Sequence, residues 1–546
     1  MNLITFLIKV SWVTVLASAI AGSISGIGSA SLIALINQSV VQIDFNRVTV
    51  PLQLVWSFAG MAGITLVTKL VSQFLLVDLA QGAIYKLRLQ ISGWILASPL
   101  PHLEELGASR LLTTLTEDIQ NISIAVSNIP ALCINVAIIL GCLLYLGRLS
   151  GWILLVTLVF LAVAITTVQF LITRVVHLFE LAREENDALM KHFRGITDGI
   201  KELKLNRHRR KDFLELELKA SVAALQKYHS RSRRVMAGIS SFGEFLFFIL
   251  IGLLVFGVPN LLPTSSTVLS GYILTLTYLM PQISSTLAIL PYLSQAGVSL
   301  RKIDALGLSL ASRSEDLEPI RHPYLGFEKI EIIKATYTYR SGEDYTFNLG
   351  PVDLSIQPGE LIFIVGGNGS GKSTLVKLIT GLYTPDTGKI YVNSNLVTNQ
   401  NREAYRQLFS AVFSEFYLFE RLLGFPHDDL DAQASFYLEQ LQLAHKVQVR
   451  NGSLSTTELS QGQRKRLALL TAYLDDRPIY IFDEWAADQD PFFREVFYRQ
   501  ILAELKQRGK AILVISHDDR YFHLSDRLIK LDYGKIVSIQ HQGKRI

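Results

Sequence analysis

Long apolar runs fill residues 1–300, whereas the remainder of the chain alternates short apolar runs with polar stretches. A helix that crosses a membrane needs about 20 predominantly apolar residues. Stretches that satisfy this requirement lie at about 3–37, 53–78, 129–147, 151–173, 238–262 and 267–298. The pattern therefore predicts a membrane α-helical part with six transmembrane helices, followed by a part that folds in water.

The first apolar stretch has a second interpretation, because Ala17-Ser18-Ala19 resembles the cleavage site of a secretory signal peptide. The apolar pattern continues past that site to Ile36, and Lys9 is the only charged residue in the stretch. We therefore expect it to be retained as the first membrane helix.

Two connecting segments, 80–128 and 174–237, are long, helical in pattern and rich in Lys and Arg, notably at Arg207–Lys211 and Arg231–Arg234. Basic segments beside membrane helices stay on the cytoplasmic side. We therefore expect both excursions and both termini to be cytoplasmic. Because membrane topology accounts for these clusters, we expect no nucleic-acid partner.

The composition agrees with a membrane protein. Hydrophobic residues make up 49% of the 546 residues and charged residues 18%, against about a quarter charged in soluble proteins. The net charge of +5 is dispersed and is weak evidence for a nucleic-acid ligand. Cys133 and Cys142 would face nearly opposite sides of one helix, so we expect no disulfide between them.

Polar residues inside the apolar stretches are candidates for a transport pathway. We expect Asn135, Gln169 and Gln282 to form hydrogen bonds between helices. Glu244 stands out, since a carboxylate inside a span is costly unless it faces protein or water. The sequence leaves open whether Glu244 packs between helices or contacts a transported molecule.

From Phe327 onward, short β runs appear at Ile330–Ile333, Tyr337–Tyr339 and Lys389–Val392, and a mostly helical stretch is expected from about 403 to 475. The clearest motif is Gly366–Ser373, which reads G-x-x-x-x-G-K-S between an apolar strand and a helix. This is the P-loop, whose backbone N–H groups bind phosphate oxygens at a helix N-terminus. The expected nucleotide-binding residues are Gly366, Asn368, Gly369, Ser370, Gly371, Lys372, Ser373 and Thr374.

The chemistry of this motif predicts a nucleoside triphosphate and a metal ion. Lys372 would supply positive charge to the β- and γ-phosphates, and the Ser373 hydroxyl would bind Mg²⁺. A second apolar strand, Ile479–Phe482, ends in Asp483 and Glu484. At this position Asp483 would hold the metal, and Glu484 would act as general base on the attacking water.

Leu459-Ser460-Gln461-Gly462-Gln463 precedes a basic helix. Ser460 can cap that helix, and Gly462 allows a close approach to an anion. An ordinary helix N-terminus has the same pattern, so this segment alone does not assign a function.

Together these motifs resemble an ATP-binding-cassette ATPase over residues 327–546, with Gln461 replacing the first glycine of the family's LSGGQ signature. The resemblance implies a head-to-tail dimer in which Ser460, Gln461, Gly462 and Gln463 contact the nucleotide held by the opposite subunit. It also implies that Tyr339 stacks on adenine, that Asp490 is the D-loop aspartate and that His517 contacts the γ-phosphate. Trp485–Gln489 departs from the usual D-loop sequence.

The glutamine that the family normally places in the Q-loop is missing. Ser414 occupies the aligned position and Glu415 follows it. Either side chain could replace the glutamine beside Mg²⁺, and we favour Ser414 because of the alignment.

Six spans with two long excursions, fused before one cassette, resemble a half-transporter exporter. The stretches Leu408–Ser414, Asp483–Pro491, Gly199–Arg207 and Ser516–Asp519 resemble the bacterial cyclic-peptide and siderophore-precursor exporters. The expected boundaries are 1–310 for the transmembrane domain, 311–326 for a linker and 327–546 for the α/β P-loop ATP-binding-cassette domain. The resemblance implies a homodimeric translocase in the lipid of a bacterial inner membrane, with the cassette cytoplasmic, that couples ATP hydrolysis to export of a peptide-like cargo. A lipid flippase and a membrane-tethered regulatory ATPase are the alternatives.

Overall fold

The computed structural model describes residues 12–42, 51–261, 264–306, 326–341, 345–425 and 429–541. The chain divides into two compact units. The first comprises Met1–Leu87 and Asp118–Arg301, and the second comprises Arg88–Glu117 and Lys302–Ile546. The expected linker, 311–326, lies outside the described residues except for Gly326, so the domain boundaries stay a prediction.

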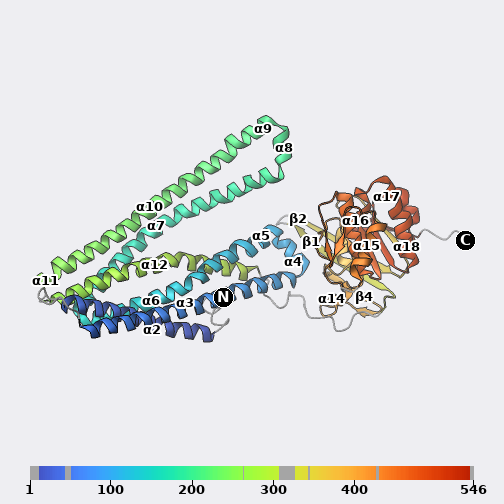
Figure 1. The fold of residues 1–546 in the computed structure, drawn as a ribbon. Helices are drawn as coiled ribbons and strands as arrows, with labels where there is room; N and C mark the ends of the chain where they lie inside the picture. Colours follow the sequence, from blue (N-terminus) through green and yellow to red (C-terminus); the bar gives the residue numbers. More distant parts are fainter. Residues whose placement is uncertain are drawn as a thin grey trace. The chain divides into compact units, whose positions relative to one another are not determined.

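Long helices make up the first unit (Figure 1). They are α2 (Trp12–Gln42), α3 (Leu52–Leu96), α6 (Ile119–Leu149), α7 (Gly151–Asp198), α10 (Lys219–Gly252) and α12 (Ser266–Ala305), with the last residues of α3 and α12 belonging to the second unit. In the described part of the chain, six helices are long and apolar enough to cross a membrane, which confirms the predicted number. Several of these helices are longer than the predicted spans; α7, for example, continues to Asp198, beyond the apolar stretch that was expected to end at about residue 173.

Helices α2 and α6 approach each other at two glycines. A Cβ on Gly26 would lie 2.4 Å from the carbonyl oxygen of Ala137, and a Cβ on Gly141 would lie 2.7 Å from the carbonyl oxygen of Gly26. Small residues allow helix backbones in a membrane to pack this closely.

One observed pair of hydrogen bonds between membrane helices comes from Asn37, which the sequence did not single out. Asn37 on α2 donates to the carbonyl of Thr267 (3.1 Å) and accepts from the hydroxyl of Ser270 (2.7 Å). By contrast, Gln282 Oε1 is buried without a hydrogen-bond partner among the described residues. The interhelical hydrogen bonds expected from Asn135, Gln169 and the Gln282 amide nitrogen stay predictions.

The second excursion forms the end of a helical hairpin. Helices α7 and α10 lie side by side and lead to α8 (Ile200–Leu205) and α9 (Arg207–Asp212) (Figure 1). The side chain of Asn206 caps α9 by accepting from the backbone N–H groups of His208 and Arg209, both at 3.0 Å. The basic cluster therefore forms the first turns of a capped helix.

The described part of the second unit contains three sheets, of which the smallest pairs β7 (Val449–Arg450) with β8 (Ser453–Leu454). The six-stranded sheet has the order β12-β11-β3-β10-β9-β6, and the four-stranded sheet has the order β2-β1-β4-β5. Their strands are β1 (Ile330–Ser341), β2 (Tyr345–Ile356), β3 (Leu361–Val365), β4 (Thr387–Val392), β5 (Asn395–Leu396), β6 (Phe409–Val412), β9 (Ile479–Asp483), β10 (Ala511–Ile515), β11 (Arg527–Asp532) and β12 (Lys535–His541). The helices include α13 (Lys372–Ile379), α14 (Arg402–Arg406), α15 (Leu430–Gln440), α16 (Gln461–Asp475), α17 (Pro491–Val496) and α18 (Leu502–Gln507).

Two local expectations need correction. The stretch from about 403 to 475 is not mostly helical, because β6 lies within it and completes the six-stranded sheet beside β9. The two apolar runs in 330–339 form one strand, β1, whose pairing with β2 shifts register between Ile332 and Ala335. Lys334 adopts a positive φ of 49° in this interval, so an irregularity in one strand separates the two runs.

Part of the first excursion belongs to the second unit. Its short helices are α4 (Leu100–Leu106) and α5 (Ala108–Thr113). The Glu104 carboxylate on α4 accepts hydrogen bonds from Lys377 Nζ on α13 (2.7 Å) and from the Tyr383 hydroxyl (2.5 Å). Helix α4 is thereby attached to the helix that follows the P-loop.

The parallel strands β3, β9 and β10 are neighbours in the larger sheet. Parallel strands end at the same edge, where ligands of open α/β sheets bind. The P-loop follows β3, Glu484 follows β9, and His517 comes two residues after β10. The fold therefore brings these three sequence segments to one edge.

Candidate active site

The P-loop forms a tight turn from β3 into α13. Gly369 and Gly371 have φ values of +74° and +98°, a region that favours glycine. A Cβ on Gly366 would lie 2.3 Å from the carbonyl oxygen of Leu531. Lys372 is buried, and its Nζ donates to the carbonyls of Gly366 (3.1 Å) and Gly367 (3.0 Å). The lysine charge therefore lies inside the loop.

Gly371 is the N-cap residue of α13, and no side chain caps the helix. The first N–H groups of a helix have no partner within the helix and carry partial positive charge. The N–H groups of Lys372, Ser373 and Thr374 are therefore arranged to bind an anion, as the sequence predicts. Asn368 and Gly369 are exposed in the turn, whereas Ser370 is buried and its hydroxyl has no hydrogen-bond partner among the described residues.

Asp483 ends β9 as a nearly buried carboxylate. Its Oδ2 accepts hydrogen bonds from the Ser373 hydroxyl (3.2 Å) and the Ser414 hydroxyl (3.1 Å). Burial raises the pKa of Asp483, and the hydrogen bonds from Ser414 and Ser373 act in the opposite direction. Its Oδ1 is buried without a hydrogen-bond partner in the described structure. Two hydroxyls and a carboxylate with a free oxygen match the hard oxygen ligands that Mg²⁺ requires.

Ser414 and Glu415 differ in their contacts. The Ser414 hydroxyl reaches Asp483, whereas both Ser414 and Glu415 are exposed and no hydrogen bond of the Glu415 carboxylate is seen among the described residues. Of the two candidates, the serine has the observed contact with the carboxylate that would hold the metal.

Glu484 and His517 meet beside Asp483. His517 Nε2 lies 3.1 Å from Glu484 Oε1, and both side chains are partly exposed. The backbone of Glu484 has a φ of 51°, which is uncommon for a residue other than glycine. Such strain persists only where the surroundings enforce it, and it is frequent at active sites.

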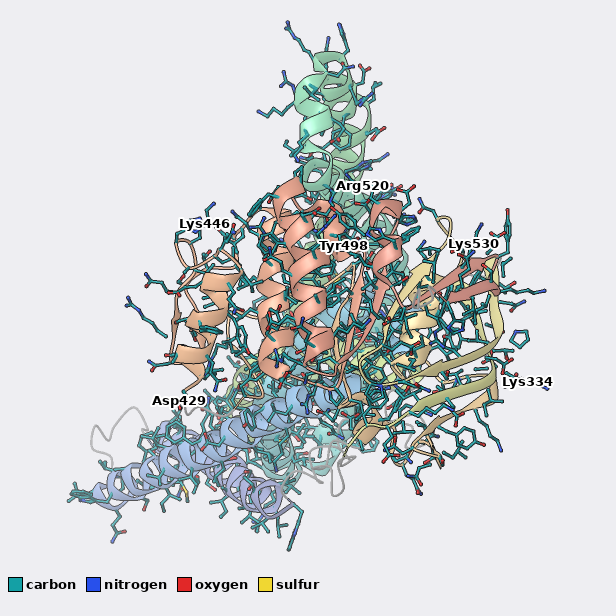
Figure 2. All side chains as sticks on the ribbon, turned by 90° about the vertical axis from the view of Figure 1, so that its right-hand side faces the viewer. Lys334, Asp429, Lys446, Tyr498, Arg520 and Lys530 are labelled. Carbon is teal, nitrogen blue, oxygen red and sulfur yellow. The ribbon has the colours of Figure 1, made fainter. Side chains whose placement is uncertain are left out.

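A cavity of about 320 Å³ opens at this pair. Its lining residues, which come from the ends of β9 and β10 and from the helices beside them, are Glu484, Ala486, Ala487, Arg494, Tyr498, Ile515, Ser516, His517, Asp518 and Arg520. Tyr498 and Arg520 are labelled in Figure 2. The carboxylate is therefore accessible to water.

Helix α16 begins with the signature segment. Ser460 is its N-cap residue, and its backbone N–H donates to Gln463 Oε1 at 3.3 Å, as in a capping box. Ser460 and Gln461 are exposed, and a Cβ on Gly462 would lie 2.6 Å from the carbonyl oxygen of Asp488. In the described part of this chain, no hydrogen bond or ion pair joins Ser460–Gln463 to the P-loop.

Asp490 caps α17, where its Oδ1 accepts from the backbone N–H of Phe493 at 2.9 Å. That hydrogen bond and the Arg466 guanidinium lower the pKa of Asp490. The carboxylate therefore remains ionised and is engaged within its own chain.

Two tyrosines of β1, Tyr337 and Tyr339, differ in their exposure to solvent. Tyr337 is buried and stacks on Tyr383, with ring centroids 4.4 Å apart. Tyr339, the residue expected to stack on adenine, is partly exposed on β1. The exposed ring is the one of the two that remains available to a ligand.

The sequence did not reveal which residues join α16 to the segment after Glu484. Lys465 Nζ donates to the carbonyl of Glu484 at 2.7 Å and lies 2.7 Å from Asp488 Oδ2. Gln489 Nε2 donates to the carbonyl of Gly462 at 3.0 Å. The only sequence feature that pointed to an unusual arrangement here was the departure of Trp485–Gln489 from the family's usual D-loop sequence.

Comparisons with known proteins agree with this architecture. The family described as "ABC transporter transmembrane region" matches residues 12–287, and the family described as "ABC transporter" matches residues 349–487. The chain is 34% identical over 540 residues to the ATP-binding protein SyrD of Pseudomonas syringae pv. syringae, covering 96% of this chain and 94% of SyrD.

Of two further similarities, one covers only part of the chain and the other shows the fold alone. An ATP-dependent lipid A-core flippase of Alkalilimnicola ehrlichii is 30% identical over 227 residues, which covers 38% of this chain and 37% of the flippase. The structure of a bacterial Atm1-family ABC exporter with ATP bound has a TM-score of 0.76 at 15% identity, covers 98% of this chain and 95% of its own, and shows the same fold. The chain therefore belongs to the ABC transporter family, as a membrane exporter in which an ATP-binding domain follows six transmembrane helices.

Proposed function

We propose that this protein is a homodimeric exporter that uses ATP hydrolysis to move a peptide-like molecule, such as a cyclic peptide, a lipopeptide or a siderophore precursor, out of the cytoplasm. The observation that carries the ATP-driven part is the convergence of Lys372, Asp483, Glu484 and His517 at one sheet edge. The peptide-like cargo is supported by the resemblance of four sequence stretches to the cyclic-peptide and siderophore-precursor exporters.

Mg²⁺ would be held by the oxygens of Ser373, Asp483 and Ser414. When bound beside the phosphates, the ion neutralises negative charge that develops on the transferred phosphoryl group. The free Oδ1 of Asp483 supports this assignment.

Glu484 accepts a proton from the water that attacks the γ-phosphate. His517 lies within hydrogen-bonding distance of the carboxylate and orients it. Lys372 and the N–H groups at the start of α13 bind the phosphates, and Tyr339 stacks on the adenine ring.

A second subunit would complete the site. Ser460–Gln463 make no described contact with the P-loop of their own chain, and Ser460 and Gln461 are exposed at a helix start that suits an anion. In a head-to-tail dimer, these residues contact the nucleotide of the partner. ATP binding then favours the closed dimer, and hydrolysis releases it.

The proposal also includes the orientation of the chain in the membrane. Both termini, the cassette and the two basic excursions lie in the cytoplasm, and the spans lie in the inner membrane of a bacterium. The basic residues at the start of α9 support this orientation.

Transport into inverted membrane vesicles tests the function. With ATP outside, the vesicles are expected to accumulate a labelled cyclic lipopeptide, and Glu484→Gln vesicles are not. Movement of a labelled phospholipid instead would identify a flippase. ATP hydrolysis without movement of either probe would favour a regulatory ATPase.

Glu244 is proposed to line the transport pathway. It lies on α10 with an exposed side chain, and an ionised carboxylate facing lipid would be costly. Glu244→Gln is expected to raise the lipopeptide concentration that gives half-maximal transport. Identical transport kinetics would assign Glu244 a packing role, and Glu217→Gln, which alters a carboxylate 60% exposed in the second excursion, is the control.

Ser414 is proposed to replace the Q-loop glutamine. Ser414→Ala removes a hydroxyl bonded to Asp483, and a hydrogen bond to a charged group contributes about 1.5–3 kcal/mol. We expect the Mg²⁺ concentration for half-maximal hydrolysis to rise about tenfold, with metal-free ATP binding little changed. Glu415→Gln is expected to be milder, and the reverse order of effects would assign the role to Glu415.

A further inference from the structure

Lys465 is a buried cation outside the set of residues proposed to bind the nucleotide or the metal. Its side chain is only 4% exposed. A buried ammonium is costly unless charged and hydrogen-bonding partners compensate it. The partners are Asp488 Oδ2 and the backbone carbonyl of Glu484, each 2.7 Å from Nζ. The carboxylate offsets the charge, and the carbonyl belongs to the proposed general base.

Lys465 donates its hydrogen bond to Glu484, the residue whose backbone is strained. Glu484 has a positive φ of 51°, a conformation that surrounding contacts must hold in place. Its N–H donates to the carbonyl of Ile515 at 3.1 Å, and its carbonyl accepts from Lys465 Nζ at 2.7 Å and from the N–H of Ala487 at 3.3 Å. Both backbone groups of Glu484 are therefore hydrogen-bonded, the N–H to β10 and the carbonyl to Ala487 and, over the shorter distance, to Lys465 on α16.

The contact is reinforced by the next residue. Trp485 Nε1 donates to the backbone carbonyl of Lys465 at 2.8 Å, and the indole ring stacks on Phe497 with centroids 4.4 Å apart. Lys465 and Glu484–Trp485 thus exchange hydrogen bonds in both directions. Trp485 is itself nearly fully buried, so this arrangement is anchored in the core.

The same helix carries the signature segment. Gln489 joins the carbonyl of Gly462 to the guanidinium of Arg466, whose Nε lies 2.9 Å from Gln489 Oε1. The first turns of α16 and the segment that follows Glu484 are therefore held together.

We propose that Lys465 is a positioning residue for ATP hydrolysis, which holds the backbone of Glu484 so that its carboxylate faces His517 and ties that backbone to the helix that begins at Ser460. The inference rests on the proposed role of Glu484 as general base. Lys465 contributes through the Glu484 carbonyl and has no direct role in binding the nucleotide.

The test compares kcat for ATP hydrolysis with the affinity for ATP in the full-length protein. Lys465→Met keeps the unbranched stem but removes the ammonium. Misplacement of a catalytic group by about 1 Å costs up to about 100-fold, so we expect kcat to fall between about 10- and 100-fold. The affinity for ATP, set by the P-loop, is expected to stay within about twofold. Lys465→Gln keeps an N–H donor with a shorter reach, so its loss of kcat is expected to be smaller.

Lys510 provides a matched control. Its Nζ also contacts the backbone carbonyl and the carboxylate of one acidic residue, Asp476, both at 2.9 Å, and it is 14% exposed. Those contacts are at the other end of α16 and do not include Glu484. Lys510→Met is expected to lower thermal stability while keeping kcat close to that of the wild type.

Three outcomes overturn the proposal: a kcat for Lys465→Met no lower than that for Lys510→Met, a parallel loss of ATP affinity, or a larger loss in Lys465→Gln than in Lys465→Met. If Lys465→Met does not fold, Lys465→Gln carries the test, and a kcat equal to that of Lys510→Met overturns the inference. Glu484→Gln in the same assay tests the general base by itself, so failure of the proposed function gives a different result.

Discussion

Glu484→Gln is expected to abolish nearly all ATP hydrolysis while leaving ATP binding intact. The amide keeps the size of the side chain and can still contact His517 Nε2, which lies 3.1 Å from the carboxylate. It cannot accept the proton of the attacking water. General-base catalysis contributes about 100- to 10,000-fold, so hydrolysis is expected to fall at least about 100-fold.

The same variant is expected to accumulate a closed, ATP-bound dimer, because Lys372 and Asp483 still bind the nucleotide and the metal. Retention of radiolabelled ATP by the dimer through size-exclusion chromatography measures the trapped nucleotide. Glu504→Gln is the control, since Glu504 is a partly exposed glutamate of the same unit whose ion-pair partner is Arg508 at 3.8 Å. Hydrolysis near the wild-type rate in Glu484→Gln would refute the assignment of the base.

Gly371→Ala is expected to weaken ATP binding by about tenfold. Residue 371 has a φ of +98°, and an added Cβ would lie 2.8 Å from Phe347 Cζ. Backbone strain of this kind costs about 1–3 kcal/mol, and about 1.4 kcal/mol corresponds to a tenfold change in affinity. Because Gly371 precedes Lys372, relief of the strain would move the ammonium and the first N–H groups of α13.

Gly367→Ala is the matched control in the same loop. Its φ is not positive, and nothing lies within 4 Å of the added Cβ. Equilibrium binding of a fluorescent ATP analogue, together with thermal unfolding, separates lost affinity from lost stability. Equal affinities of the two variants would show that the left-handed turn at Gly371 is not required for nucleotide binding.

A third glycine variant separates the two causes of the expected loss. Gly369 has a positive φ of +74° but open space around an added Cβ. Gly369→Ala therefore introduces backbone strain without a contact like that of Gly371→Ala with Phe347. An affinity between those of Gly367→Ala and Gly371→Ala would show that both strain and overlap contribute.

The sequence by itself determined the six membrane helices, the P-loop and the acidic strand end. These features depend on neighbouring residues: an apolar stretch long enough to cross the bilayer, or a strand, a glycine-rich turn and a helix in immediate succession. Asp483 and Glu484 could be placed for the same reason, because the strand and the carboxylates adjoin. The family resemblance then extended the expected site to residues far apart in the chain.

Only the tertiary structure decided which of the distant residues meet. The contact of Ser414 with Asp483 depends on β6 lying beside β9, although 69 positions separate the two residues. The contact of Lys465 with Glu484 likewise depends on how α16 packs against the segment after β9. A basic residue at the start of a helix is usually solvated, and local sequence does not reveal that this one is buried. Burial, and with it the need for a charged partner, follows from packing between elements that are not adjacent in sequence.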